Sequence, residues 1–181
     1  MQIRGEQLKQ RAAEAGASVE ALAQAVERTG LEGPRAVTAV RNWMTGKDHP
    51  RCKPSDIRKL AQTLGCQVSD IARFVSQVRT HRGSTQKARL VADLIRGRGA
   101  NEAKDILHFS HKRAAVNVTK CLDAAITDAA DLGADTDRLW IAHCTVDEGP
   151  QIKRFKAKDR GRAHPIIKQT SHITIGVEER L

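Results

Sequence analysis

Aromatic residues are scarce in this chain. They make up 3% of its 181 residues and include no tyrosine. Since hydrophobic residues still reach 40%, we expect an aliphatic, alanine-rich core. The scarcity also argues against a protein that binds single strands mainly by stacking bases on aromatic side chains. The only aromatic residues available are Trp43, Trp140, Phe74, Phe109 and Phe155.

Cysteine motifs are absent too. Four cysteines, Cys52, Cys66, Cys121 and Cys144, are irregularly spaced and form no Cys-x-x-Cys pair. This spacing argues against a zinc site or a disulfide scaffold and favours small, reduced, buried thiols. His108 and His111 lie three residues apart, but no cysteine or carboxylate stands near them in ligand register. We therefore predict no metal and no cofactor.

Motifs that carry catalysis are also missing. The chain has no Gly-x-Ser-x-Gly elbow, no phosphate-binding Gly-Lys-Ser loop and no dinucleotide fingerprint. Asp147 and Glu148 are neighbours, but adjacent strand residues point to opposite faces and would not share a site. With Gly149 and Pro150 after them, they indicate a bend. We predict that the protein is not an enzyme.

No stretch approaches the roughly 18 apolar residues of a membrane span, and residues 1–6 have no apolar signal region. The chain is therefore expected to be cytoplasmic, with no membrane partner.

Positive charge, by contrast, is abundant. The formal net charge is +10, and residues 71–181 carry 20 basic against 13 acidic residues. The densest run holds one acid, Asp159, among six cations: Lys153, Arg154, Lys156, Lys158, Arg160 and Arg162. Such a charge excess concerns partners rather than fold, and the densest regular source of negative charge is the phosphate backbone of nucleic acid. The sequence therefore predicts a nucleic-acid partner.

Residues 1–70 read as a domain of short helices. Helical spacing and Gly or Pro boundaries predict helices over 7–15, 19–28, 34–46 and 54–64, with Ser18 as an N-cap and Ser69 capping a last short turn. The pattern from Ser18 to Pro50 resembles helix-turn-helix domains of the Xre and lambda-repressor type. That resemblance implies a third helix that reads DNA above a packed Trp43. Arg35, Thr38, Ala39, Arg41 and Asn42 would then lie on or beside the reading helix, with nucleic-acid contact expected from Arg35, Thr38, Arg41 and Asn42. The alternative is a helical bundle that reads no DNA.

Residues 71–181 have a different pattern. Alternation predicts strands over 71–80, 139–146 and 171–177. Between the first two lie predicted helices over 85–96, 101–109 and 111–131, with Ser84 and Ser110 as caps and one face of small apolar residues on the third. This order predicts an α+β domain in which a three-stranded sheet packs on three helices. Residues 147–170 would form a long basic β-hairpin, since a polar segment of about 20 residues in a compact domain is usually functional or disordered.

Several blocks of this second domain closely resemble bacterial large-subunit ribosomal protein L22. They are Ser84–Gly97, Lys112–Ala115, Val146–Pro150, Lys153–Arg154, Gly161–Ala163 and Thr170–Thr174. The resemblance runs from about Phe74 to Val177 in the family's order and spacing. It implies a structural protein of the large subunit that binds large-subunit ribosomal RNA, assists assembly and lines the peptide exit tunnel with its hairpin.

The resemblance and the charge pattern together define the candidate site residues. Those expected to bind RNA are Lys87, Arg89, Arg96, Lys112, Arg113, Lys153, Arg154, Lys156, Lys158, Arg160, Arg162 and Lys168. Those expected, by resemblance, to line the tunnel are Ile152, Lys153, Arg154, Gly161, Arg162 and Ala163. The implied partners are large-subunit ribosomal RNA, neighbouring large-subunit proteins and the nascent peptide, in the cytoplasmic ribosome. The competing hypothesis is a helix-turn-helix DNA regulator whose basic C-terminal part is auxiliary.

Overall fold

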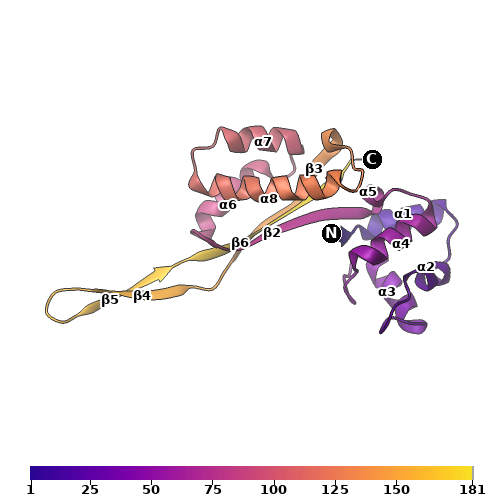
Figure 1. Ribbon diagram of the computed structural model, residues 1–181, viewed down its shortest axis with the longest axis horizontal. Coiled ribbons are helices and arrows are strands. Elements are labelled where there is room, and N and C mark those ends of the chain that lie inside the picture. Colours follow the sequence, from indigo (N-terminus) through magenta and orange to yellow (C-terminus); the bar gives the residue numbers. More distant parts are fainter. Residues whose placement is uncertain (181) are drawn as a thin grey trace. The chain divides into compact units, whose positions relative to one another are not determined.

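The computed structural model describes residues 1–180 (Figure 1). Helices and antiparallel strands are both present, so the chain has the predicted α+β class. It divides into two compact units. The N-terminal unit comprises residues 1–74, 128–136 and 178–180, and the hairpin unit comprises residues 75–127 and 137–177. Each unit is described separately below.

Five short helices build most of the N-terminal unit: α1 (Gly5–Glu14), α2 (Val19–Val26), α3 (Pro34–Met44), α4 (Pro54–Leu64) and α5 (Val68–Ile71). Their boundaries follow local chemistry. The Ser18 hydroxyl accepts a hydrogen bond from the Ala21 N–H at 3.2 Å and caps α2, as predicted. Pro34 and Pro54 occupy the first turns of α3 and α4, where a missing N–H costs nothing. The Ser69 cap is wrong, because Gln67 is the N-cap of α5.

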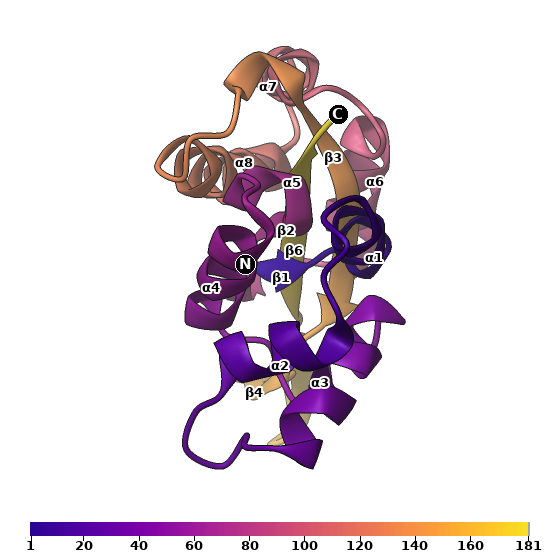
Figure 2. The ribbon, with the colours of Figure 1, turned by 90° about the vertical axis from the view of Figure 1, so that its right-hand side faces the viewer.

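The core of this unit lies between α2, α3 and α4. Helices α2 and α3 lie side by side (Figure 2). Their buried residues include Leu22, Val40 and Trp43, each with no exposed surface. The indole N–H of Trp43 donates to the Pro50 carbonyl at 2.7 Å, so the one large aromatic ring among these helices is both packed and hydrogen-bonded.

A two-residue strand in this unit has no counterpart among the sequence predictions. Strand β1 (Gln2–Ile3) pairs antiparallel with the first residues of β2 (Ala72–Arg82), with Gln2 opposite Arg73. The sheet therefore has four strands in the order β1-β2-β6-β3, and the prediction of three was wrong. Two residues are too few to show a period of two, so no sequence pattern could have revealed β1.

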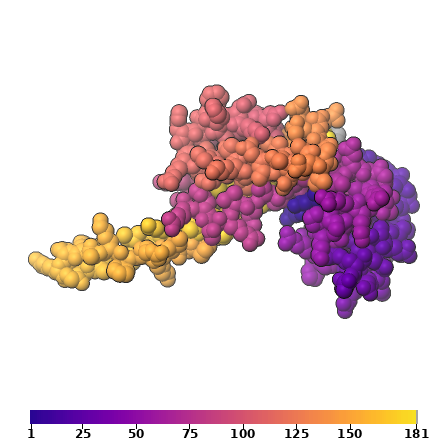
Figure 3. All heavy atoms as spheres, in the orientation of Figure 1, coloured from indigo at the N-terminus to yellow at the C-terminus, as the bar shows by residue number. Residues whose placement is uncertain are grey.

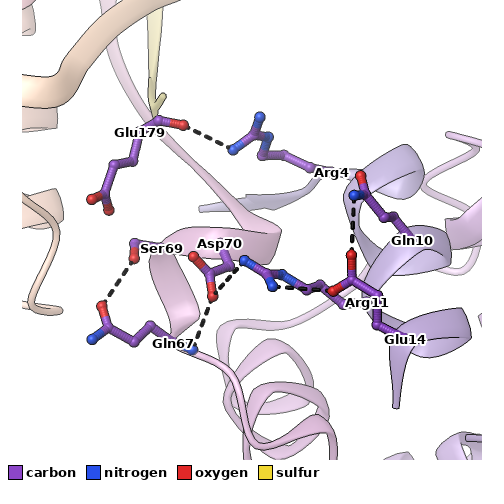
Figure 4. A network of polar contacts seen from close by, with 8 residues as sticks. All are labelled: Arg4, Gln10, Arg11, Glu14, Gln67, Ser69, Asp70 and Glu179. Carbon is purple, nitrogen blue, oxygen red and sulfur yellow. Dashed lines mark hydrogen bonds and ion pairs between the residues drawn. The ribbon is translucent and has the colours of Figure 1, made fainter. Parts of the chain in front are cut away.

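Polar contacts hold the ends of the N-terminal unit together (Figure 4). The Arg11 guanidinium lies between Glu14, at 3.1 Å, and Asp70, at 3.4 Å, and so joins α1 to α5. The Arg4 guanidinium donates to the Glu179 carbonyl at 3.2 Å. Arg4 therefore connects the start of α1 to the last residues of β6 (Thr170–Glu179).

In the hairpin unit, β2, β6 and β3 (Leu139–Glu148) form the sheet, and three helices accompany it: α6 (Thr85–Ile95), α7 (Ala100–His108) and α8 (Arg113–Ala130). The small-residue face of α8 is buried, as predicted, at Ala115, Val118, Cys121, Leu122 and Ala125. Because these side chains are short, α8 approaches the sheet closely. The Cys121 thiol lies 3.3 Å from the Ser76 carbonyl of β2.

Two predicted caps differ from the structure. Ser84 occupies the N-cap of α6, as expected, but its side chain makes no capping hydrogen bond. Ser110 does not cap α8, because that helix begins at Arg113 and the Ala115 N–H bonds to the Lys112 carbonyl. Residues 109–112 form a loop instead.

The hairpin is a separate two-stranded sheet of β4 (Ile152–Ala157) and β5 (Ala163–Lys168). It stands clear of the helices of its own unit as a thin ribbon (Figure 3). Its base is held by two bonds: the Gly149 N–H donates to the Thr170 carbonyl at 2.9 Å, and the Thr170 hydroxyl donates to the Pro150 carbonyl at 2.6 Å. The bend predicted at Asp147–Pro150 thus joins the end of β3 to the start of β6.

Candidate nucleic-acid interface

The hairpin has two chemically different faces. Its register runs from Ile152 opposite Lys168 to Ala157 opposite Ala163, and directly opposed residues share a face. One face, the basic face, carries Arg154, Lys156 and Lys168 together with Ile152, His164 and Ile166. The other, the apolar face, carries Lys153, Phe155, Ala157, Ala163, Pro165 and Ile167. The basic run is therefore an amphipathic ribbon, and its positive charge is not spread evenly over both faces.

The tip of the hairpin is a tight turn that carries three of the candidate cations. The Arg162 N–H donates to the Asp159 carbonyl at 3.2 Å, and the Lys158 N–H donates to the Arg162 carbonyl at 2.7 Å. Arg160 and Gly161, the two central residues, have φ of 53° and 70°. Positive φ at both positions is typical of a type I′ turn, whose twist matches that of paired strands. Gly161 therefore suits a turn that carries Lys158, Arg160 and Arg162 at the far end of the ribbon.

The hairpin cations form no ion pair within the described part of the chain. Every residue from Lys153 to Gln169 is exposed. Among residues 1–180, none of the seven cations from Lys153 to Lys168 pairs with a carboxylate, and the Arg154 guanidinium bonds only to the Lys153 carbonyl. Since like charges repel, a ribbon of this kind is suited to binding a polyanion.

Two residues predicted to contact RNA, Arg89 and Arg96, also hold α6 to β3. Arg89 Nε donates to the Val146 carbonyl at 3.1 Å. Arg96 Nε and Nη2 donate to the Cys144 carbonyl at 3.3 and 3.0 Å, and its Nη1 pairs with Asp93 at 2.8 Å. Both residues are nevertheless exposed, so they hold α6 to β3 at the surface of the unit.

The other predicted contacts gather where the hairpin leaves its unit. Lys87 is exposed in the first turns of α6, and Lys112 and Arg113 are exposed at the start of α8. Arg113 lies close enough to His81, at the end of β2, that its charge, added to the larger effect of burial, lowers the pKa of that imidazole. The starts of α6 and α8 lie beside the base of the hairpin (Figure 1).

Basic residues at the end of β2 are absent from the predicted contacts. Arg79 and Arg82 are exposed there. The Thr80 N–H donates to Nδ1 of His172 at 3.0 Å, which places this end of β2 beside the start of β6. The alternating pattern of residues 71–80 marks the strand, but no sequence signal shows that its end adjoins the hairpin base.

In the N-terminal unit, the residues expected to contact nucleic acid from α3 are not equivalent. Arg35, Thr38 and Arg41 are exposed. Asn42 is half-buried, and its amide donates to the His49 carbonyl at 2.7 Å, so it holds the loop after α3. Ala39 lies on α3, as expected, and has no exposed surface.

The model of one protein family, ribosomal protein L22p/L17e, matches residues 76–178, more than half of the chain. The chain belongs to this ribosomal protein family. It is therefore a structural protein of the large ribosomal subunit rather than an enzyme. The matched residues include all of α6, α7, α8, β3 and the hairpin. Every candidate RNA-binding residue of the hairpin unit therefore lies within the matched residues, which are called the L22p/L17e part below.

The L22p/L17e match begins after α1 to α5, which lie in residues 1–75.

Within residues 1–180, no three histidine, cysteine or acidic side chains come together as metal ligands. No described helix has both the length and the apolar character that a membrane span needs.

Proposed function

We propose that this L22p/L17e chain binds large-subunit ribosomal RNA through its hairpin unit and assists assembly of that RNA. The observation that carries the proposal is the amphipathic hairpin, an exposed two-stranded ribbon whose cations have no carboxylate partner among the described residues. A ribbon two strands wide reaches between converging phosphate backbones where a globular domain would not fit. Neutralising those phosphates releases their counterions and supplies affinity.

The base of the hairpin extends the same surface. Lys87, Lys112 and Arg113 are exposed near the end of β2 and the start of β6, and Arg79 and Arg82 add positive charge there. Contact at the base would position the protein on RNA before the ribbon is inserted. Neighbouring large-subunit proteins are expected partners of the other surfaces of this unit.

The hairpin is further proposed to line the peptide exit tunnel and to meet the nascent peptide there. The six residues expected in the tunnel wall divide between the two faces and the tip. Ile152 and Arg154 lie on the basic face, Lys153 and Ala163 on the apolar face, and Gly161 and Arg162 in the turn. We assign the apolar face and the tip, with Lys153, Ala163, Gly161 and Arg162, to the tunnel wall, and the basic face, with Ile152 and Arg154, to RNA.

The proposal is tested by following the full chain in cell extracts. It should sediment with large subunits and stay with them through a high-salt wash. Replacing Lys153, Arg154, Arg160 and Arg162 with alanine should weaken binding to large-subunit RNA and lower the salt slope by about 0.7 to 0.9 for each phosphate that the variant no longer neutralises. If the chain is found only in the fraction that contains no ribosomal subunits, the proposal is wrong.

A second candidate function, a helix-turn-helix reader of DNA, concerns the N-terminal unit and rests on one observation. Helix α3 packs through Trp43 and presents Arg35, Thr38 and Arg41 on its exposed side. If α3 reads DNA, the full chain should enrich a preferred sequence from a random duplex pool, and Arg35→Ala with Arg41→Ala should abolish that preference. Enrichment of no sequence would leave α1 to α5 as a packing or RNA-docking extension.

A further inference from the structure

The three phenylalanines of this chain have very different environments. Phe74 is 1% exposed and belongs to the core. Phe109 and Phe155 are 78% and 80% exposed, the two largest exposures among the large apolar side chains of the described residues. In a chain with so few aromatic rings, two exposed ones need a reason. Phe155 lies on the hairpin already discussed, whereas Phe109 lies in a part of the hairpin unit with no assigned role.

Phe109 is held on an ordered turn. It is the C-cap of α7, and its N–H bonds to the Asp105 carbonyl at 3.2 Å, while the next N–H, of Ser110, bonds to the Leu107 carbonyl at 3.2 Å. Its ring meets the His108 ring edge to face, with 5.4 Å between the ring centres. Leu107, 3% exposed, anchors the end of the helix in the core. The phenyl ring is therefore presented to solvent by a backbone that is fixed on both sides.

The charge that follows the ring along the chain is entirely positive. From His108 to Lys120 the chain holds Lys112, Arg113 and Lys120 and no acidic residue. Arg113, which follows the loop 109–112, also lowers the pKa of His81, so the start of α8 lies near the end of β2. The exposed ring is therefore followed at once by cations of the surface proposed to contact RNA.

A hollow of about 570 Å³ lies beside this loop, between α7 and α8. Leu107, Ala115 and Val116 contribute its apolar part, and Lys104 and Lys120 contribute cations. Two acids also line it: Asp123 is paired with Lys104 at 3.3 Å, whereas Asp105 is exposed, so Lys120 is the cation that remains to meet a phosphate. The volume lies in the range of small-ligand sites.

We propose that Phe109 is a stacking platform for an unpaired RNA base, with the hollow between α7 and α8 receiving that nucleotide or its neighbour. Lys112 and Arg113 hold the adjoining phosphates. RNA is recognised chiefly where bases are unstacked and can lie against aromatic side chains, and every base offers a π face. A protein partner would gain from the ring's apolar area but not from the positive charge of Lys112, Arg113 and Lys120 that follows it along the chain. The inference rests on the proposed binding of large-subunit RNA.

The test measures binding of the full chain to a transcript of large-subunit ribosomal RNA from the same genome, over a range of salt concentrations. Phe109→Ala should weaken binding about 5- to 150-fold, as removal of one stacked base does. The salt slope should not change, because the ring neutralises no phosphate. Phe109→Trp should keep the wild-type affinity, since it keeps a flat π face, and the thermal midpoint should not move in either variant.

Two controls separate the possible failures. Lys112→Gln should lower the salt slope by about 0.7 to 0.9, unlike the change at Phe109. If the wild-type chain shows no salt-dependent binding to the transcript, the proposed RNA-binding function itself fails. If the wild type binds and Phe109→Ala binds equally well, RNA binding stands and the stacking platform is overturned, which would leave the ring as an interface for a neighbouring protein.

Discussion

The guanidinium of Arg4 lies 3.2 Å from the carboxylate of Glu178, and both side chains are largely buried. Arg73 Nε donates to the other oxygen of the same carboxylate. One acid thus binds two cations, from the segment before α1 and from the start of β2, within the N-terminal unit. The triad connects residues 1–74 to the last residues of β6, so the helical extension is fastened to the end of the L22p/L17e part.

Replacing Glu178 with glutamine should therefore destabilise the N-terminal unit. The change keeps the shape of the side chain but leaves two buried or half-buried guanidinium groups without their counter-charge. Breaking a fully buried pair costs about 3–5 kcal/mol, and the partial exposure of Arg73 reduces this to about 2–3 kcal/mol. Urea unfolding followed by tryptophan fluorescence would measure the loss, with Trp140 replaced by phenylalanine in both proteins so that only Trp43 reports.

The matched control is Glu14→Gln, which removes the acid of the exposed Arg11–Glu14 pair. Exposed pairs contribute about 0–1 kcal/mol, so its midpoint should hardly move. An equal effect of the two substitutions would mean that burial of the Glu178 triad does not matter to the stability of the unit.

A second stability prediction concerns Gly5, the first residue of α1. A Cβ added there would lie 2.3 Å from the Trp43 carbonyl oxygen and 2.9 Å from the Gly46 nitrogen. Both are backbone atoms that cannot turn aside, so Gly5→Ala must push α1 away from the end of α3. We expect a loss of about 2–3 kcal/mol, as in other overpacked sites.

Gly16→Ala is the control for this prediction. Gly16 has φ of 61° but no heavy atom within 4 Å of the added Cβ. Gly16→Ala should lower the free energy of unfolding by only about 1 kcal/mol, which is the strain of an alanine backbone in the left-handed region. Similar denaturant midpoints for the two variants would contradict the close approach at Gly5.

Elements whose ends carry strong local preferences could be foreseen from the sequence. Helix α4 is predicted to the residue because Pro54 and Gly65 mark both ends with clear backbone preferences. The hairpin is predicted because six cations in ten residues have no use in a core. The start of α8 was misplaced because Ser110 has the side chain of a cap, and nothing local excludes it.

Other features depend on contacts between distant residues. The division of the hairpin into two faces follows from register, and register follows from the turn at Arg160 and Gly161. Arginine rarely adopts a positive φ, so the sequence does not identify the turn type. The exposure of Phe109 was also unforeseen, because an apolar residue at the end of a helical pattern is expected in the core until its surroundings are known.

The tip turn itself can be tested at Gly161. Valine there must adopt the left-handed region that its branched side chain disfavours, so Gly161→Val should open the turn. The Lys158 N–H, now 2.7 Å from the Arg162 carbonyl, should then exchange with solvent faster. Amide exchange followed by NMR measures this. Arg160→Asn should not speed the exchange, because asparagine tolerates a positive φ.

A pH prediction follows from Cys52, which is 3% exposed. Burial, with the charges of Asp56 and Asp48, raises the pKa of its thiol to about 12, against a usual 9.0. Because the unfolded chain loses this proton at lower pH than the folded chain, the folded state loses relative stability as pH rises from 9 toward 12. Replacing Cys52 with alanine should reduce the fall in urea midpoint between about pH 8 and about pH 10.5. If the urea midpoint of the variant falls with pH as much as that of the wild type, the Cys52 thiol ionises equally in the folded and unfolded states.

The two faces of the hairpin make the sharpest prediction about RNA binding. If the basic face meets phosphate, replacing Arg154, Lys156 and Lys168 together with glutamine should lower the salt slope by about 2 to 3, at about 0.7 to 0.9 per phosphate. Lys153 has the same charge but lies on the opposite face with Phe155, so Lys153→Gln should leave the slope within error of the wild type. Filter binding of the full chain to large-subunit RNA at several salt concentrations measures both. A slope that falls by about one for Lys153→Gln would place phosphate on both faces and remove the proposed division between RNA and tunnel.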